Sequence, residues 1–186
     1  MIQILAYVII GLVVLGILNT IVYSYNQLVM LQNNVDKSFV NIDVILKQRA
    51  DEIPDLIKVV KETMRYEELM LTKLTKLRTS FLNTTNSNEK IELSNQIQNQ
   101  IKSIFAISEN YPDLKANQNL QLLQNRISQL EDSIADRREL YNETVNMYNI
   151  GIGEFPNLIL AKIMFYSRRQ LLQITEQEIK YDGITF

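Results

Sequence analysis

The feature that most constrains this chain is a long apolar run at its N-terminus. No charged side chain occurs before Asp36, and the twenty residues from Ile4 to Tyr23 are broken only by two glycines, Asn19 and Thr20. At about 1.5 Å per residue, a helix of this length spans roughly the 30 Å hydrocarbon layer of a bilayer. The run therefore predicts a transmembrane anchor over residues 1–24, with membrane lipid as the partner of residues 4–23.

Two other interpretations of the apolar run, a cleaved signal peptide and a buried core helix, fit the sequence less well. A cleaved signal peptide needs a basic start and a small-residue cleavage site, and neither is present. A buried core helix seldom runs this long without a charge. The nearest basic residues, Lys37, Lys47 and Arg49, all follow the run. The positive-inside bias then favours a single-pass protein of the cell membrane with a cytoplasmic C-terminal domain.

Composition limits the chemistry of the remaining chain. Its 186 residues are 46% apolar, which suits one domain beside the anchor. The net charge is −2, from 19 basic and 21 acidic residues, so the chain has no basic excess to attract nucleic acid. Cysteine and histidine are both absent, which removes thiolate nucleophiles, disulfides, the usual zinc sites and the commonest acid–base group. We expect no cofactor and no enzymatic activity.

Apolar spacing after the anchor is helical, with steps of three and four residues. A first helix can run from the membrane to about Ala50, and further stripes cover Leu56–Phe81, Ile97–Phe105 and Leu120–Tyr148. The last stripe is heptad-like and resembles a coiled-coil seam. The pattern predicts an all-α fold, in which residues 25–186 form an antiparallel up-and-down bundle of about four long helices plus a short C-terminal helix.

All three prolines stand in one setting, an apolar residue, Pro, Asp or Asn, and Leu. The three sites are "IPDL" at Pro54, "YPDL" at Pro112 and "FPNL" at Pro156. Proline tolerates the first turn of a helix, and Asp or Asn there can cap free N–H groups or oppose the helix dipole. Each motif therefore predicts a helix start. At Pro54 the alternative, a kink within one longer helix, stays open.

Polar residues crowd two of the predicted helix ends. The Tyr-Asn pairs 141–142 and 148–149 recur at a spacing of seven, which places them on one helix face. They are either a surface for a protein partner, or core tyrosines whose hydroxyls and neighbouring asparagines satisfy helix ends. The candidate partner-binding residues are Tyr111, Lys115, Asn117, Arg137, Tyr141, Asn142, Tyr148 and Asn149.

The segment Phe155–Leu172 is apolar but carries Lys162, Arg168 and Arg169. This composition suits a position at a membrane surface with anionic head groups. In an up-and-down bundle the fourth helix ends close to the bilayer, so the segment begins near lipid. The three cations are therefore candidate lipid contacts. Packing against the open end of the bundle is the alternative.

Carboxylates at the helical seams raise the question of a metal site. Asp36, Asp43, Glu131 and Asp136 lie near these seams, but the histidines that complete carboxylate-bridged sites are absent. Ion pairs with Lys or Arg are the favoured interpretation. No Gly-x-Ser-x-Gly frame and no phosphate-binding glycine loop occurs.

Three long pieces of the sequence resemble the LemA family of bacterial membrane proteins. They are "YNQLVMLQNNVDKSFVNIDVILKQRADEIPDLI" from Tyr25, "YPDLKANQNLQLLQNRISQLEDSIADRRELYNETVNMYN" from Tyr111 and "FPNLILA" from Phe155. Phe39 stands where tryptophan is expected, and residues 65–90 are only loosely similar. The resemblance implies a single-pass anchor followed by an antiparallel bundle and supplies no catalytic residues. It also suggests a membrane zinc peptidase as partner.

Two functional hypotheses follow. The favoured one is a membrane-anchored, non-enzymatic interaction or scaffold protein that presents its bundle to another membrane protein or to a second copy of itself. The alternative is an activity at the bilayer, either remodelling of lipid or assistance to a membrane peptidase.

Overall fold

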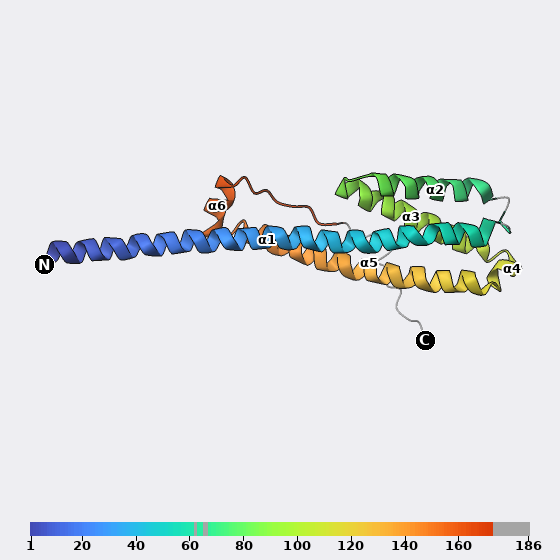
Figure 1. Cartoon of the computed structure of the whole chain (residues 1–186), viewed down its shortest axis with the longest axis horizontal. Helices are drawn as coiled ribbons and strands as arrows, with labels where there is room; N and C mark the ends of the chain where they lie inside the picture. The colour runs from blue at the N-terminus through green and yellow to red at the C-terminus, as the bar shows by residue number, and fades with distance from the viewer. Residues whose placement is uncertain (62, 65–66, 173–186) are drawn as a thin grey trace, which may run out of the picture. The chain divides into compact units, whose positions relative to one another are not determined.

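The computed structural model describes residues 1–61, 63–64 and 67–172, and these residues form six α-helices and no strand (Figure 1). The all-α prediction is confirmed. The helices are α1 (Ile2–Lys61), α2 (Glu68–Asn83), α3 (Ser87–Ser108), α4 (Pro112–Lys115), α5 (Gln118–Gly151) and α6 (Asn157–Ile163).

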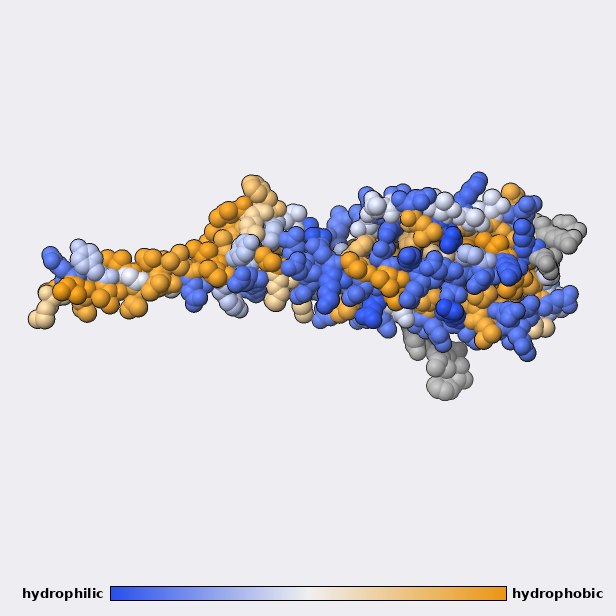
Figure 2. Space-filling view, viewed as in Figure 1, coloured by the Kyte–Doolittle hydropathy of each residue, from blue (hydrophilic) through white to orange (hydrophobic). Residues whose placement is uncertain are grey.

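The chain divides into two compact units that share α1 and α5. Unit 1 contains Met1–Asn41 and the residues from Arg137 onward, and unit 2 contains Ile42–Asp136. The predicted anchor, residues 1–24, is the first part of α1. By length and composition, α1 is able to cross a membrane, and none of its most apolar stretch is buried within the protein. Figure 2 shows mainly apolar residues on the visible face of this stretch.

Unit 2 is an antiparallel arrangement of four long helical segments, joined through short connections (Figure 1). They are the end of α1, α2, α3 and the start of α5, and the single turn of α4 lies between α3 and α5. Spacings of three and four residues along each segment direct one apolar face inward. The buried apolar residues of this unit include Ile42, Leu46, Ile53, Leu56, Val60, Leu71, Leu74, Phe81, Ile97, Ile101, Ile104, Leu120, Ile127 and Ile134.

The predicted helix start at Pro54 is wrong, because α1 continues through this proline to Lys61. A proline inside a helix lacks the N–H that would bond to the carbonyl four residues earlier, which here is that of Ala50. The Nε–H of Arg78, on α2, donates to this carbonyl over 2.9 Å. Arg78 also lies 3.7 Å from the Asp51 carboxylate. A side chain from α2 thus replaces the missing backbone donor, and the helix passes through.

The other two proline motifs begin helices as predicted. Pro112 is the first residue of α4, and Tyr111 before it is extended, with φ −110° and ψ 98°. Pro156 directly precedes α6. Between α2 and α3, Asn86 caps α3 by accepting from the N–H groups of Asn88 and Glu89.

Candidate partner-binding and lipid-contacting sites

The two asparagines of the Tyr-Asn repeat bind the backbone of the segment that follows α6. The Asn142 side chain accepts from the Leu172 N–H at 2.8 Å and donates to the Leu172 carbonyl at 3.0 Å. The Asn149 side chain accepts from the Arg169 N–H and donates to the Arg169 carbonyl, both at 2.9 Å. Both asparagines lie on α5 in unit 1. They therefore hold a chain segment and do not cap a helix end.

The two tyrosines of the repeat are buried in unit 1 beside these asparagines. Tyr141 packs edge-on against Phe39, with ring centroids 6.0 Å apart. The Tyr148 hydroxyl donates to the Ser167 carbonyl at 3.1 Å, on the segment that the asparagines hold. Burial raises the pKa of the Tyr141 phenol; nearby Arg169 opposes this shift and Asp36 adds to it. Tyr141 therefore stays protonated and neutral at physiological pH.

The three cations of the segment Phe155–Leu172 have different surroundings. The Arg169 guanidinium lies 3.1 Å from the Asp36 carboxylate and 5.9 Å from the centroid of the Tyr148 ring. Lys162 and Arg168 are exposed. Arg169 thus contacts Tyr148 of the Tyr-Asn repeat. Lys162 and Arg168, in contrast, have the exposure that head-group binding requires.

The remaining candidate residues do not join this cluster. Arg137 is exposed on α5 in unit 1. Tyr111, Lys115 and Asn117 belong to unit 2, where Lys115 ends α4 and the other two flank it. The Asn117 side chain caps α5 by accepting from the N–H groups of Asn119 and Leu120. Asn117 therefore has a structural role, and Lys115 and Arg137 are the exposed side chains of the set.

An apolar groove of about 760 Å³ lies in unit 1 between α1 and α6. Figure 1 shows α6 beside the N-terminal part of α1. The residues that α1 contributes lie between Val13 and Ser24, so α6 adjoins the segment that is long enough to cross a bilayer. The groove is lined by Val13, Gly16, Ile17, Thr20, Ile21, Ser24, Phe155, Pro156, Ile159, Leu160 and Ile163.

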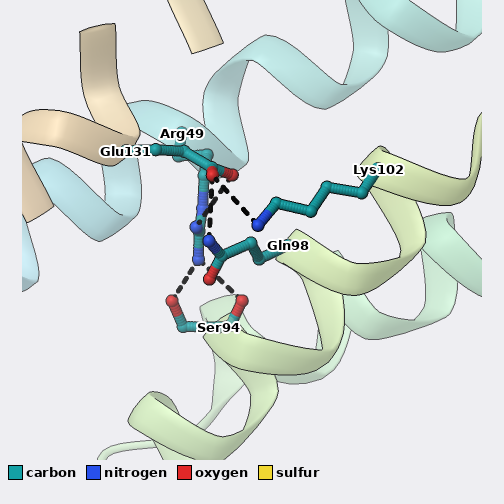
Figure 3. Close-up of polar contacts among 5 residues, drawn as sticks. All are labelled: Arg49, Ser94, Gln98, Lys102 and Glu131. Atoms are coloured by element: carbon teal, nitrogen blue, oxygen red, sulfur yellow. Dashed lines mark hydrogen bonds and ion pairs between the residues drawn. The ribbon is translucent and has the colours of Figure 1, made fainter. Parts of the chain in front are cut away.

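A buried polar cluster in unit 2 joins α1, α3 and α5 (Figure 3). The side chain of Arg49 is 1% exposed, and its Nη2 donates to the Ser94 carbonyl at 2.6 Å and to the Ser94 hydroxyl. Its Nη1 lies 3.7 Å from Oε1 of Glu131. Gln98 donates to the other oxygen of Glu131 at 2.9 Å, and Lys102 lies 3.9 Å from it.

The chemistry of this cluster suits a structural role, in which polar contacts hold three helices together. Arg49 is permanently charged and has no acceptor, so it cannot act as a base. Its guanidinium connects α1 to α3 and α5 and fixes their register, as a single polar residue in an apolar seam often does. We did not predict the burial of Arg49, although the sequence indicates it. Arg49 is the one charged member of a series of residues spaced by seven along α1. The series is Leu28, Val35, Ile42, Arg49 and Leu56, and all five are buried.

Three of the four seam carboxylates form ion pairs with cationic side chains. Asp36 pairs with Arg169, and Glu131 pairs with Arg49. Asp43 accepts from the Lys90 ammonium through both carboxylate oxygens at 2.8 Å. These charges are thus neutralised within the protein, as expected for structural carboxylates near a core.

Comparison with known proteins gives a family match and two curated relatives. The model of the LemA family matches residues 38–186. The magnetosome proteins MamQ 2 and MamQ 1 of Paramagnetospirillum magneticum (strain ATCC 700264 / AMB-1) are each 32% identical over 75 residues. That match covers 40% of this chain and 28% of the length of each relative.

Proposed function

Because the chain belongs to the LemA family, we propose that it is a single-pass, membrane-anchored helical protein that presents its bundle to another membrane protein. The observation that carries this proposal is the contrast along α1. Its apolar stretch is uncovered within the protein, whereas the continuation of the same helix buries Ile42, Leu46 and Ile53. The N-terminal part needs an apolar environment that the protein itself does not supply, and a bilayer provides it.

The partner surface that we propose includes the exposed cations of the candidate set. Lys115 of unit 2 and Arg137 of unit 1 are exposed. Exposed basic side chains suit acidic surfaces of a second protein, since complementary charge steers association. Each unit therefore offers one exposed site to test.

Photocrosslinking in membranes tests this interaction function. A photoreactive amino acid at Lys115 or Arg137 is expected to give a discrete protein adduct, because a binding surface holds its partner within reach of the probe. The matched control places the probe at Lys76, which is exposed on α2 of unit 2. Identical adducts from the control, or lipid adducts alone from all three positions, would contradict the interaction function.

A second candidate function, an activity at the bilayer surface, is supported by the exposed apolar side chains around α6. Phe155, Ile159, Ile163 and Phe165 are 79%, 53%, 65% and 92% exposed. A short apolar segment beside a membrane-spanning helix is suited to insertion among head groups, with Lys162 reaching toward them. We propose that α6 is a second lipid-contacting element of this protein.

Fluorescence quenching by brominated lipid tests the position of α6. The chain has no tryptophan, so a single one reports its own surroundings. In reconstituted vesicles, the Phe165→Trp variant is expected to be quenched by brominated acyl chains, because its side chain lies in lipid. The control is Leu140→Trp, on α5 next to Tyr141, whose ring contacts Phe39. Along α1, Phe39 lies about 24 Å beyond Tyr23, outside the bilayer. Equal quenching of the two variants would contradict lipid insertion of α6.

A further inference from the structure

The same pair of hydrogen bonds occurs twice between α5 and the segment Tyr166–Leu172. Asn142 and Asn149 are seven residues apart on α5, and the residues whose backbone they bind, Leu172 and Arg169, are three apart. Seven helical residues rise about 10.5 Å, and three extended residues span about 10 Å. The two asparagines thus match the repeat of an extended chain that runs antiparallel to α5.

The same three-residue step decides which side chains of the segment turn inward. Tyr166, Arg169 and Leu172 are half-buried, whereas the residues between them are exposed. The Tyr166 ring lies 6.3 Å from the Tyr148 ring, and Arg169 pairs with Asp36. The surface formed by this face of α5 and by Asp36 of α1 therefore suits an extended segment with a particular sequence. Such a segment carries an aromatic residue, an arginine three positions later, and an apolar residue three positions after that.

The contacts that hold the segment are of a kind that another peptide can make. Both asparagines bind only main-chain N–H and C=O groups, which every extended peptide presents. The ion pair is partly exposed, at 37% for Arg169 and 53% for Asp36, and exposed pairs contribute little to stability. The segment has neither helix nor strand of its own. Polar, solvent-accessible contacts of this type open at low free-energy cost.

We propose that Asn142, Asn149, Tyr148 and Asp36 form a binding groove for an extended segment of a partner protein, one that carries arginine three residues from an aromatic and from an apolar residue. Residues 166–172 occupy this groove in the free chain and compete with the partner. Charge supports this choice of partner, because the Asp36 carboxylate opposes the single inward cation of the bound segment. The groove lies within unit 1 and does not depend on α1 crossing a membrane.

Peptide binding to the full chain in detergent tests the groove. The probe is a fluorescein-labelled peptide of the sequence "FYSRRQLL", residues 165–172. Wild type is expected to bind it weakly, because its own segment competes. Arg169→Glu places a carboxylate against Asp36, releases the resident segment and leaves the groove intact, so fluorescence anisotropy should show tighter binding. Adding Asn142→Ala and Asn149→Ala should weaken that binding about tenfold or more, since each asparagine contributes two hydrogen bonds.

Two further measurements keep the outcome unambiguous. Hydrogen exchange should show the amides of Arg169 and Leu172 protected in wild type and unprotected in Arg169→Glu. Asp36→Arg should bind a peptide whose second arginine is glutamate better than the original peptide. The groove is refuted if the peptide fails to bind once exchange shows the segment released, or if the asparagine variants bind it equally well. If this segment is exchanged between two copies of the chain to form dimers, the proposal that the groove binds a different protein is wrong.

Discussion

Replacing Glu131 by leucine is expected to destabilise unit 2 by about 3–5 kcal/mol, because it removes the carboxylate that opposes the buried charge of Arg49. The Arg49 side chain is 1% exposed, so water cannot take over this role. Arg49→Met should cost less, about 1–3 kcal/mol, since Glu131 is 19% exposed and keeps Gln98 and Lys102. Urea denaturation of the protein in detergent, followed by circular dichroism, measures both.

The double variant distinguishes a charge effect from a packing effect. When Arg49→Met is added to Glu131→Leu, stability should partly return, because apolar side chains of similar size replace both members of a buried pair without leaving a charge behind. Lys102→Met is the control. Its side chain is 50% exposed, and loss of an exposed pair costs about 0–1 kcal/mol. Simple addition of the two large losses would contradict the role of Arg49 and Glu131 as a charge pair.

Replacing Arg78 by methionine is expected to cost about 1–3 kcal/mol, because the buried Ala50 carbonyl loses the donor that Pro54 cannot supply. Pro54→Ala should stabilise α1 by about 1–3 kcal/mol, since alanine restores the backbone N–H and relieves the clash of the proline ring. In the Pro54→Ala background the carbonyl has its helical partner, and Arg78→Met should then cost at least about 1 kcal/mol less than in wild type.

The same denaturation experiment measures the free energy of unfolding of the two single variants and of the double variant. Thr79→Ala, on the exposed surface next to Arg78, is the control and should leave the free energy of unfolding nearly unchanged. Additive effects of Pro54→Ala and Arg78→Met would mean that Arg78 does not compensate for the proline, and that α1 passes through Pro54 for another reason.

Local patterns in the sequence were sufficient to predict most helices. The seven-residue series from Leu120 to Tyr148 predicted the buried face of α5, and its members Leu120, Ile127, Ile134, Tyr141 and Tyr148 are all buried. The motif at Pro112 predicted a helix start, because proline favours the first turn of a helix and the residue before it is extended. Such signals can be read from sequence because both partners of each interaction lie in the same short stretch.

The features that the sequence did not predict depend on residues far apart along the chain. Continuation of α1 through Pro54 depends on Arg78, 28 positions from the carbonyl that it satisfies. The contacts of Asn142 and Asn149 on α5 likewise join them to residues 30 and 20 positions further along the chain. Spacing predicted that these asparagines share a face, but their binding to a main chain required the fold.

A membrane-spanning α1 places the two ends of its apolar stretch on opposite sides of the bilayer. The chain has no cysteine, so single cysteines at Gln3 and Asn33, both exposed, report the two ends of the span. In sealed vesicles of one orientation, a membrane-impermeant maleimide should label only one of the two, and detergent should make the other accessible. Labelling of Asn33→Cys from the cytoplasmic side would also place the bundle there, as the basic residues after the span predict. Equal labelling of both cysteines in intact vesicles would contradict a transmembrane α1 and, with it, the proposed membrane anchor.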